Sequence, residues 1–345
     1  MNDRSDLRQR VRAWAGKDKA RQATAATVLA LADAGREIAE VAGRGNLGEP
    51  LGAATGLRGP IDAQKRLDVV ANDIIADALR EAPVAALASE EMEEPLALRQ
   101  GAPLLVAVDP IDGSSNIDAD VTIGTILSIL PAADADGREC GFLQPGNRQL
   151  AAGFLVYGPY TSLVLSLGRG VDVFTLDRPA GGFRLTRADV RIPEGTREYA
   201  LNVANYRYWD EPIRHYLDHC LSGREGPRGV DFNMRWTGSP VAEFYRILSR
   251  GGVFIYPADL RHGYAHGRLR LLYEANPFAF IMEQAGGAAS NGRERLLDLV
   301  PQRLHQHVPV IAGARDEVGY AAELHRNPLA GERSPLFGRR GLFRL

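Results

Sequence analysis

Apolar residues recur along the chain with the 3.6-residue spacing of amphipathic helices in several stretches. An alanine-rich stretch from about residue 20 to residue 41 shows it, and a second one follows Asp68. A third covers residues 241–248, and a fourth opens at Asn276-Pro277 and continues over residues 278–284. The positions expected on the apolar faces of the first two helices are Val28, Leu31, Ile38 and Val41, then Val70, Ile74, Ala78 and Leu79.

Short apolar runs, several of them rich in β-branched residues and bounded by turn residues, predict strands between these helices. A pair of strands is expected over residues 150–167, turned at Gly158-Pro159. The other expected strands cover residues 84–88, 104–108, 121–130, 171–174, 183–185, 199–203, 253–256 and 269–273. Helices mixed with strands in this way indicate an α/β protein.

Three regions show no clear periodicity of hydrophobic residues. Residues 1–20 are charged and poorly patterned, and we expect them to be partly disordered; residues 43–59 are glycine-rich and are expected to form a loop. The pattern also fades over residues 187–197, where Pro193 and Gly195 favour a boundary. The sequence therefore predicts two domains, residues 1–192 and residues 193–345.

Composition narrows the class of protein. The 345 residues are 45% hydrophobic and 24% charged, which is typical of a globular protein. A net charge of −2 gives no general attraction to nucleic acid or to anionic membranes. Two cysteines, Cys140 and Cys220, make no disulfide framework, and no apolar run is long enough to cross a membrane. We expect a cytoplasmic protein with a small-molecule partner.

The chemistry concentrates after the run at residues 104–108. Asp109 and Asp112 stand three apart in what is expected to be a tight turn, so both carboxylates can face one small volume that suits Mg²⁺ or Mn²⁺. Gly113, Ser114 and Ser115 follow and resemble the start of a helix, whose free N–H groups attract phosphate. Asp-Pro and Asp-Gly are also ordinary turn dipeptides, and the serines could simply cap a helix.

Other acidic residues are expected at strand ends or turns, where ligands bind in open α/β sheets. Together they predict a site for two or three metal ions that hydrolyses a phosphomonoester with a metal-activated water. Asp68 and Glu91 would polarise that water, and Asp62 would serve a third metal or a mobile loop. The expected metal ligands are Glu90, Asp109, the Ile111 carbonyl, Asp112 and Glu274.

Arginines gather in the second half of the chain, at positions 235, 261, 268 and 270. Their planar guanidinium groups suit a second phosphate on the substrate, although any one of them could be simple solvated surface. Asn202, Trp236 and Tyr256 could add contacts to a sugar. We interpret the histidine pairs His262/His266 and His305/His307 as solvated loop residues rather than metal ligands.

These residues resemble the class I fructose-1,6-bisphosphatase family, within the lithium-sensitive metal-dependent sugar phosphatases. The resemblance runs from about residue 20 to the C-terminus. It rests on several motifs in the same order, at residues 64–68, 89–91, 109–118, 238–257, 269–277 and 334–338.

The resemblance implies an αβαβα layered sandwich and a Mg²⁺-dependent homotetramer that removes the 1-phosphate of fructose 1,6-bisphosphate. It implies the metal ligands named above and a reacting phosphate held by residues 112–115. It also implies that Arg235 reaches across from a neighbouring subunit. The sugar and its 6-phosphate would contact Asn202, Trp236, Tyr256, Arg268 and Arg270.

The family pattern is not followed everywhere. Trp236 stands where tyrosine is frequent and Arg268 where lysine is frequent, which bears on substrate preference. Pro103 and Leu104 replace a Lys-Tyr pair that contacts AMP in vertebrate-type enzymes, so inhibition by AMP is not implied. An inositol monophosphatase is the nearest rival enzyme, but the continuation Ser114-Ser115-Asn116-Ile117 and the presence of Glu274 argue against it. Two alternatives stay open: a dual or preferential sedoheptulose-1,7-bisphosphatase, and a non-catalytic sugar-phosphate sensor. The pathway, gluconeogenesis or the Calvin cycle, stays open too.

Overall fold

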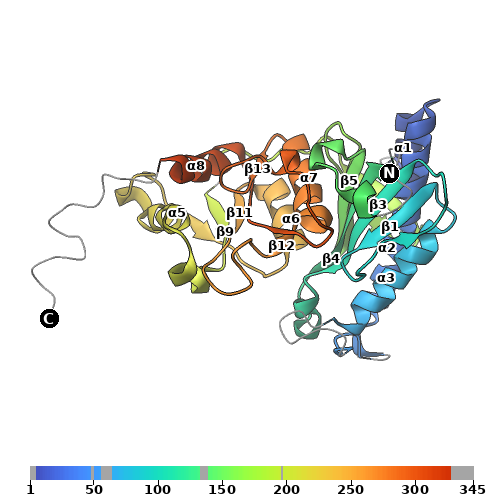
Figure 1. Ribbon diagram of the computed structural model, residues 1–345, viewed down its shortest axis with the longest axis horizontal. Helices are drawn as coiled ribbons and strands as arrows, with labels where there is room; N and C mark the ends of the chain where they lie inside the picture. The colour runs from blue at the N-terminus through green and yellow to red at the C-terminus, as the bar shows by residue number, and fades with distance from the viewer. Residues whose placement is uncertain (1–4, 48–49, 56–63, 133–138, 196, 328–345) are drawn as a thin grey trace, which may run out of the picture.

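Five layers alternate between helices and sheets in the computed structural model, which describes residues 5–47, 50–55, 64–132, 139–195 and 197–327 (Figure 1). One core cluster joins α1, α2 and α3 to a first sheet, and a second joins that sheet to α6, α7 and a second sheet. A third joins the second sheet to α5 and α8. The αβαβα sandwich is therefore confirmed.

The first sheet has eight strands in the order β2-β1-β3-β4-β5-β6-β7-β8. β1 and β3 are parallel, and all other neighbours are antiparallel. The bounds are β1 Val84–Ser89, β2 Leu96–Ala97, β3 Leu104–Asp112, β4 Ile123–Pro131, β5 Ala151–Tyr157, β6 Thr161–Ser166, β7 Asp172–Asp177 and β8 Gly182–Arg187. The strands predicted in this half are confirmed, including the turn at Gly158-Pro159.

The second sheet has the order β10-β9-β11-β15-β13, and a two-stranded ladder pairs β12 with β14. The bounds are β9 Glu198–Ala200, β10 Asn233–Met234, β11 Val253–Tyr256, β12 Leu269–Arg270, β13 Ala288–Ser290, β14 His307–Val308 and β15 Val310–Gly313. The predicted strand at residues 269–273 is wrong beyond Arg270, because residues 271–275 form a helical turn. A short run that is apolar at every position fits a buried helix as well as a strand.

Eight α-helices lie in the described ranges, and those predicted near residues 20–41, 68–79, 241–248 and 278–284 are among them. In the second of these Leu79 is buried as expected, but the rest of the buried face, with Leu67, Ala71 and Ile75, lies one position away from the expected one. The bounds are α1 Leu7–Ala15, α2 Lys19–Gly43, α3 Arg66–Leu79, α4 Glu139–Phe142, α5 Glu211–Leu221, α6 Pro240–Arg250, α7 Asn276–Gln284 and α8 Arg315–Arg326.

The expectation of disorder near the amino terminus is wrong for α1. Asp6 caps this helix, and Leu7, Val11 and Ala15 are buried against the first core. A stripe with i, i+4 spacing suffices to bury one helix face, even where the other positions are charged. Of the expected loop at residues 43–59, residues 45–47 form a 3₁₀ turn. No helix in the described ranges is long and apolar enough to span a bilayer.

Candidate active site

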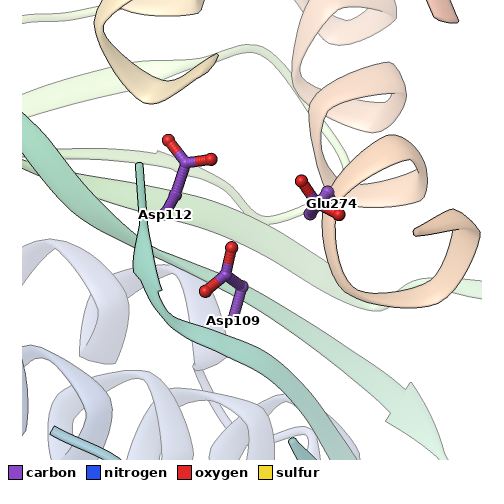
Figure 2. Close-up of side chains that lie close together, drawn as sticks. All are labelled: Asp109, Asp112 and Glu274. Carbon is purple, nitrogen blue, oxygen red and sulfur yellow. The ribbon is translucent and has the colours of Figure 1, made fainter. Parts of the chain in front are cut away.

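Asp109 and Asp112 both lie in β3, not in a tight turn as expected. Asp109 pairs with Ile126 of β4 and Asp112 pairs with Gly124, so two residues of β3 oppose the single residue Thr125. This bulge matters because side chains alternate between the faces of a strand, and residues three apart would otherwise point to opposite faces. The extra residue brings both carboxylates toward the same volume (Figure 2).

The bulge has its own support in the buried core. Pro110 has no N–H to give to the ladder, and its carbonyl accepts a hydrogen bond from the Thr125 hydroxyl at 2.7 Å. The Thr125 hydroxyl also contacts the hydroxyl of Tyr157 at 2.8 Å. A short chain of hydroxyl groups therefore fixes the backbone between the two aspartates.

Glu274 reaches the same volume from the other half of the chain. It lies in the π-helical turn Leu271–Ala275 that precedes α7, not at a strand end. The backbone N–H of Arg270 donates to its Oε2 at 2.6 Å and so fixes the carboxylate. Figure 2 shows Glu274 facing the two aspartates of β3.

Carboxylate oxygens of Asp109, Asp112 and Glu274 lie within 4.8 Å of one another, and the three residues are only 3–5% exposed. Burial, followed by the charge of Glu90, raises the pKa of Asp109 and of Glu274 well above the usual values. The pKa of Asp112 is raised to about 7, chiefly by burial, although the N–H of Val241 at the start of α6 donates to it at 2.9 Å. Three buried acids that resist ionising together are a donor set that a divalent cation fits.

Three further acidic residues surround this group. Glu90 directly follows β1, and its carboxylate contacts that of Asp109 and pairs with the guanidinium of Arg270. Glu91 accepts a hydrogen bond from the Gln64 amide. Asp68 is 1% exposed at the start of α3 and accepts from the backbone N–H of Lys65 at 2.6 Å. Asp62 lies outside the described residues.

Gly113, Ser114 and Ser115 come next. Gly113 has φ of 76°, a conformation that glycine adopts at little cost, and it turns the chain out of β3. The expected helix start is a six-residue 3₁₀ segment, Ser114–Ala119. Gly113, Ser114 and Ser115 at the start of this turn line the cleft, with less of a helix dipole behind them than expected.

A cleft of about 690 Å³ contains most of the predicted site residues. It connects Asp112 and Glu274 of the acidic group with Arg268 and Arg270. Among the predicted residues, Asp68, Glu90, Glu91, Ile111, Asp112, Gly113, Ser114, Ser115, Tyr256, Arg268, Arg270 and Glu274 line it.

Three predicted substrate contacts lie away from this cleft. Asn202 lines a small adjoining crevice, together with Tyr256 and Arg268. The ring of Trp236 stacks on Phe254 and meets Tyr256 edge-on, so it supports Tyr256 from the side. Arg235 has a side chain that is 50% exposed and lies 3.8 Å from Glu198.

Several residues that line the cleft were not predicted as site residues from the sequence. Gln64 and Lys65 line the cleft and hold Glu91 and Asp68; their place in the motif just before Asp68 was the available signal. His262 and Tyr264 line it from the loop after β11, where the sequence carries no periodicity. His307 also lines it, from β14.

The histidine interpretation is confirmed in part. His262 and His266 are exposed in a loop. His305 and His307 are half-buried, and Nε2 of His305 lies 3.0 Å from the carbonyl of Met92. None of the four belongs to the group of potential metal ligands found in the described ranges. Cys220 is buried with a free thiol.

Comparisons with known proteins agree with this geometry. Family models described as the N-terminal and C-terminal domains of fructose-1,6-bisphosphatase match residues 12–188 and 192–326. A class 1 fructose-1,6-bisphosphatase of Bradyrhizobium diazoefficiens is 56% identical over 325 residues, covering 94% of each chain. One from Rhodopseudomonas palustris is 55% identical over 331 residues, covering 95% of this chain and 96% of the relative.

The fold is similar to a solved structure as well. The crystal structure of Leishmania major fructose-1,6-bisphosphatase in holo form superposes with a TM-score of 0.86 at 33% identity. The match covers 94% of this chain and 99% of that one.

Proposed function

The chain belongs to the fructose-1,6-bisphosphatase family, and from this premise we propose that it hydrolyses the 1-phosphate of fructose 1,6-bisphosphate. The products are fructose 6-phosphate and inorganic phosphate, so the enzyme is a phosphoric monoester hydrolase. The observation that carries the proposal is the group of three buried carboxylates at the head of a cleft that also holds two arginines. The three alternatives raised from the sequence are not favoured by these relatives.

The family depends on metal, and the three carboxylates fit a cation. We propose that the ion is Mg²⁺, with two or three per subunit, held by Asp109, Asp112, Glu274, Glu90 and the Ile111 carbonyl. Bound cations would lower the pKa of a water and neutralise charge on the leaving oxygen. Glu90 would have to exchange its contact with Arg270 for this role.

Asp68 and Glu91 are proposed to accept the proton of the attacking water. Both line the cleft beside the acidic group, and each is oriented by a neighbour, Lys65 for Asp68 and Gln64 for Glu91. Orientation by a hydrogen bond is what a general base needs before it can take a proton from a bound water. A supporting role of Asp62 stays a prediction.

The two ends of the substrate are assigned to the two ends of the cleft. Backbone N–H groups of Gly113, Ser114 and Ser115 would hold the reacting phosphate next to Asp112. Arg268, Arg270 and Tyr256 would hold the sugar and the 6-phosphate, with Asn202 and Trp236 beside them.

We further propose a homotetramer in which Arg235 serves a neighbouring subunit, since its side chain is half exposed and lies outside this chain's own cleft. A division after residue 192 is supported by the sheets, because the first ends at Arg187 and the second begins at Glu198. In this proposal the first domain carries most of the metal ligands and the second binds the sugar. A cytoplasmic location is proposed on composition alone.

The first test is phosphate release from fructose 1,6-bisphosphate with Mg²⁺ and with EDTA, in the wild type and in Asp112→Asn. Asparagine keeps the size of the side chain and can still accept from the Val241 N–H, but it lacks the charge. We expect release with Mg²⁺ only, and loss of most activity in the variant. Sedoheptulose 1,7-bisphosphate, assayed in parallel, measures the substrate preference.

A folded wild-type chain that releases no phosphate from either sugar with Mg²⁺ present would exclude a bisphosphatase. Release that persists in EDTA, or in Asp112→Asn, would exclude the metal-site assignment.

A further inference from the structure

One loop borders the end of the cleft that holds Arg268. It spans residues 257–268 after β11, and it is folded by its own backbone hydrogen bonds. The N–H of Asp259 donates to the Tyr264 carbonyl at 3.0 Å, and the N–H of Tyr264 donates to the Arg261 carbonyl at 3.1 Å. This fold brings two arginines of the loop to one carboxylate, that of Asp259, which is 5% exposed.

Arg261 takes most of the hydrogen-bonding capacity of Asp259. Its backbone N–H and its Nε donate to Oδ1 at 3.0 and 3.1 Å, and its Nη2 donates to Oδ2 at 2.5 Å. The same Nη2 also donates to the Asn205 amide oxygen at 2.9 Å, and the guanidinium lies over the ring of Tyr208. Arg261 is therefore held in place and is not among the residues that line the cleft.

Arg268 contacts the same carboxylate far more weakly. Its Nη2 lies 3.7 Å from Oδ2 of Asp259, the oxygen that Arg261 holds at 2.5 Å. The Arg268 guanidinium instead stacks on the ring of Tyr264, 3.7 Å from its centroid, and lines the cleft. A carboxylate that already accepts bidentate hydrogen bonds from one guanidinium has little acceptor capacity left for a second guanidinium.

We propose that Arg261 is a positioning residue for substrate binding: by occupying Asp259 it keeps this carboxylate from pairing closely with Arg268. The charge of Arg268 then stays directed at the phosphate that is distant from the reacting one. Neither Arg261 nor Asp259 touches the substrate. The inference rests on the proposed function, because it takes the ligand of Arg268 to be the second phosphate of a sugar bisphosphate.

The experiment compares Arg261→Leu, Asp259→Asn and the double variant with the wild type, using kcat and KM for fructose 1,6-bisphosphate with saturating Mg²⁺. Arg261→Leu releases Asp259 to pair with Arg268. We expect KM to rise roughly tenfold, the effect of losing about one charge-assisted hydrogen bond, while kcat stays within about twofold. Asp259→Asn should leave KM near the wild-type value.

The double variant tests whether Asp259 causes the rise in KM. With no carboxylate to capture Arg268, KM should return to within about threefold of the wild type. Recovery in the double variant does not by itself exclude a merely structural role of Arg261, because removing the buried Asp259 charge also relieves the defect left by its lost partner. A merely structural defect of the loop would, however, also slow the hydrolysis of a substrate that lacks the second phosphate. Fructose 1-phosphate, which lacks the second phosphate, should be hydrolysed equally by Arg261→Leu and by the wild type.

Two results overturn the inference: an unchanged KM in Arg261→Leu, or a double variant as impaired as the single one. If Arg261→Leu does not fold, Arg261→Lys replaces it, because an ammonium lacks the planar fork with which the guanidinium binds both oxygens of Asp259. The KM of Arg261→Lys should rise and again be restored by Asp259→Asn. A wild type without activity would refute the proposed function itself, whereas an active wild type with insensitive variants would refute only this inference.

Discussion

Replacing Thr125 with valine should weaken both the fold and the metal site, although Thr125 touches no substrate. The change conserves shape and removes one hydroxyl. That hydroxyl has a single proton, which goes to the Pro110 carbonyl because a carbonyl can only accept. Tyr157 must then be the donor in its contact with Thr125. Burial raises the pKa of Tyr157, so its hydroxyl stays protonated and can donate.

The expected loss in free energy of unfolding follows from these hydrogen-bond directions. Thr125→Val leaves two buried groups, the Pro110 carbonyl and the Tyr157 hydroxyl, without their partner. At about 1–3 kcal/mol for each unsatisfied group, the free energy of unfolding should fall by roughly 2–6 kcal/mol. Tyr157→Phe is the matched control, because it removes the outer hydroxyl and leaves the bond to Pro110 in place. Its cost should be about 1–3 kcal/mol.

The Mg²⁺ requirement should differ between Thr125→Val and Tyr157→Phe more clearly than their stability does. The Thr125–Pro110 bond fixes the bulge that turns Asp109 and Asp112 to the same side. Losing such a support of metal ligands typically costs at least about tenfold in metal affinity or activity. The Mg²⁺ concentration for half-maximal phosphate release should therefore rise roughly tenfold in Thr125→Val and little in Tyr157→Phe.

Urea unfolding and a Mg²⁺ titration of activity measure both quantities on the same preparations. Equal Mg²⁺ requirements in the two variants would show that the bulge does not depend on Thr125. A Thr125→Val protein as stable as the wild type would show that the Pro110 carbonyl finds another partner.

Three other predictions concern the whole chain. Mg²⁺ should raise the thermal unfolding midpoint and EDTA should reverse the rise, because a cation removes the repulsion among the three buried carboxylates; no shift in calorimetry would contradict this. Burial acts to raise the pKa of Glu198, but two arginines of α6 hold it below the unfolded value of about 4.3. Its stabilisation is therefore complete at neutral pH and is lost as the pH falls through the folded pKa, so the cost of Glu198→Gln in urea unfolding should shrink below about pH 4. Gly124→Ala should destabilise strongly, since its Cβ would lie 2.1 Å from the Leu155 carbonyl, whereas Gly319→Ala, with open space in α8, should stabilise by roughly 0.5–1 kcal/mol. Circular dichroism melts of the two glycine variants check this pair.

Much of the first half of the fold could be predicted because its strands are short apolar runs separated by clear turns. The run at residues 104–108 predicted β3, and the acids after it predicted the metal ligands. The bulge was missed because it depends on which residue of β4 faces Pro110, and pairing register is not written in one strand alone. The structure therefore places the two aspartates in a strand where the sequence suggested a turn.

The second half was harder to predict for a related reason. The run Leu271–Tyr273 is buried on all sides, and such a run has no polar face to reveal its period. The basic residues raised a similar difficulty. Arg261 and Arg268 look alike in the sequence, but Asp259 binds the first tightly and leaves the second to the cleft. Charge alone could not separate them, because the separation comes from the shape of one loop.

The position of the acidic group links the two halves of the molecule. Asp109 and Asp112 belong to the first sheet, whereas Glu274 and the Val241 N–H that binds Asp112 belong to the helical layer between the sheets. A cation bound by all three carboxylates would therefore hold the first sheet against that layer. Metal binding and the contact between the two layers are then thermodynamically linked. A change that weakens this contact must weaken metal binding, and bound metal must stabilise the contact by the same coupling free energy. Substitutions in the α6–β4 contact should thus be detected first as an increased requirement for Mg²⁺.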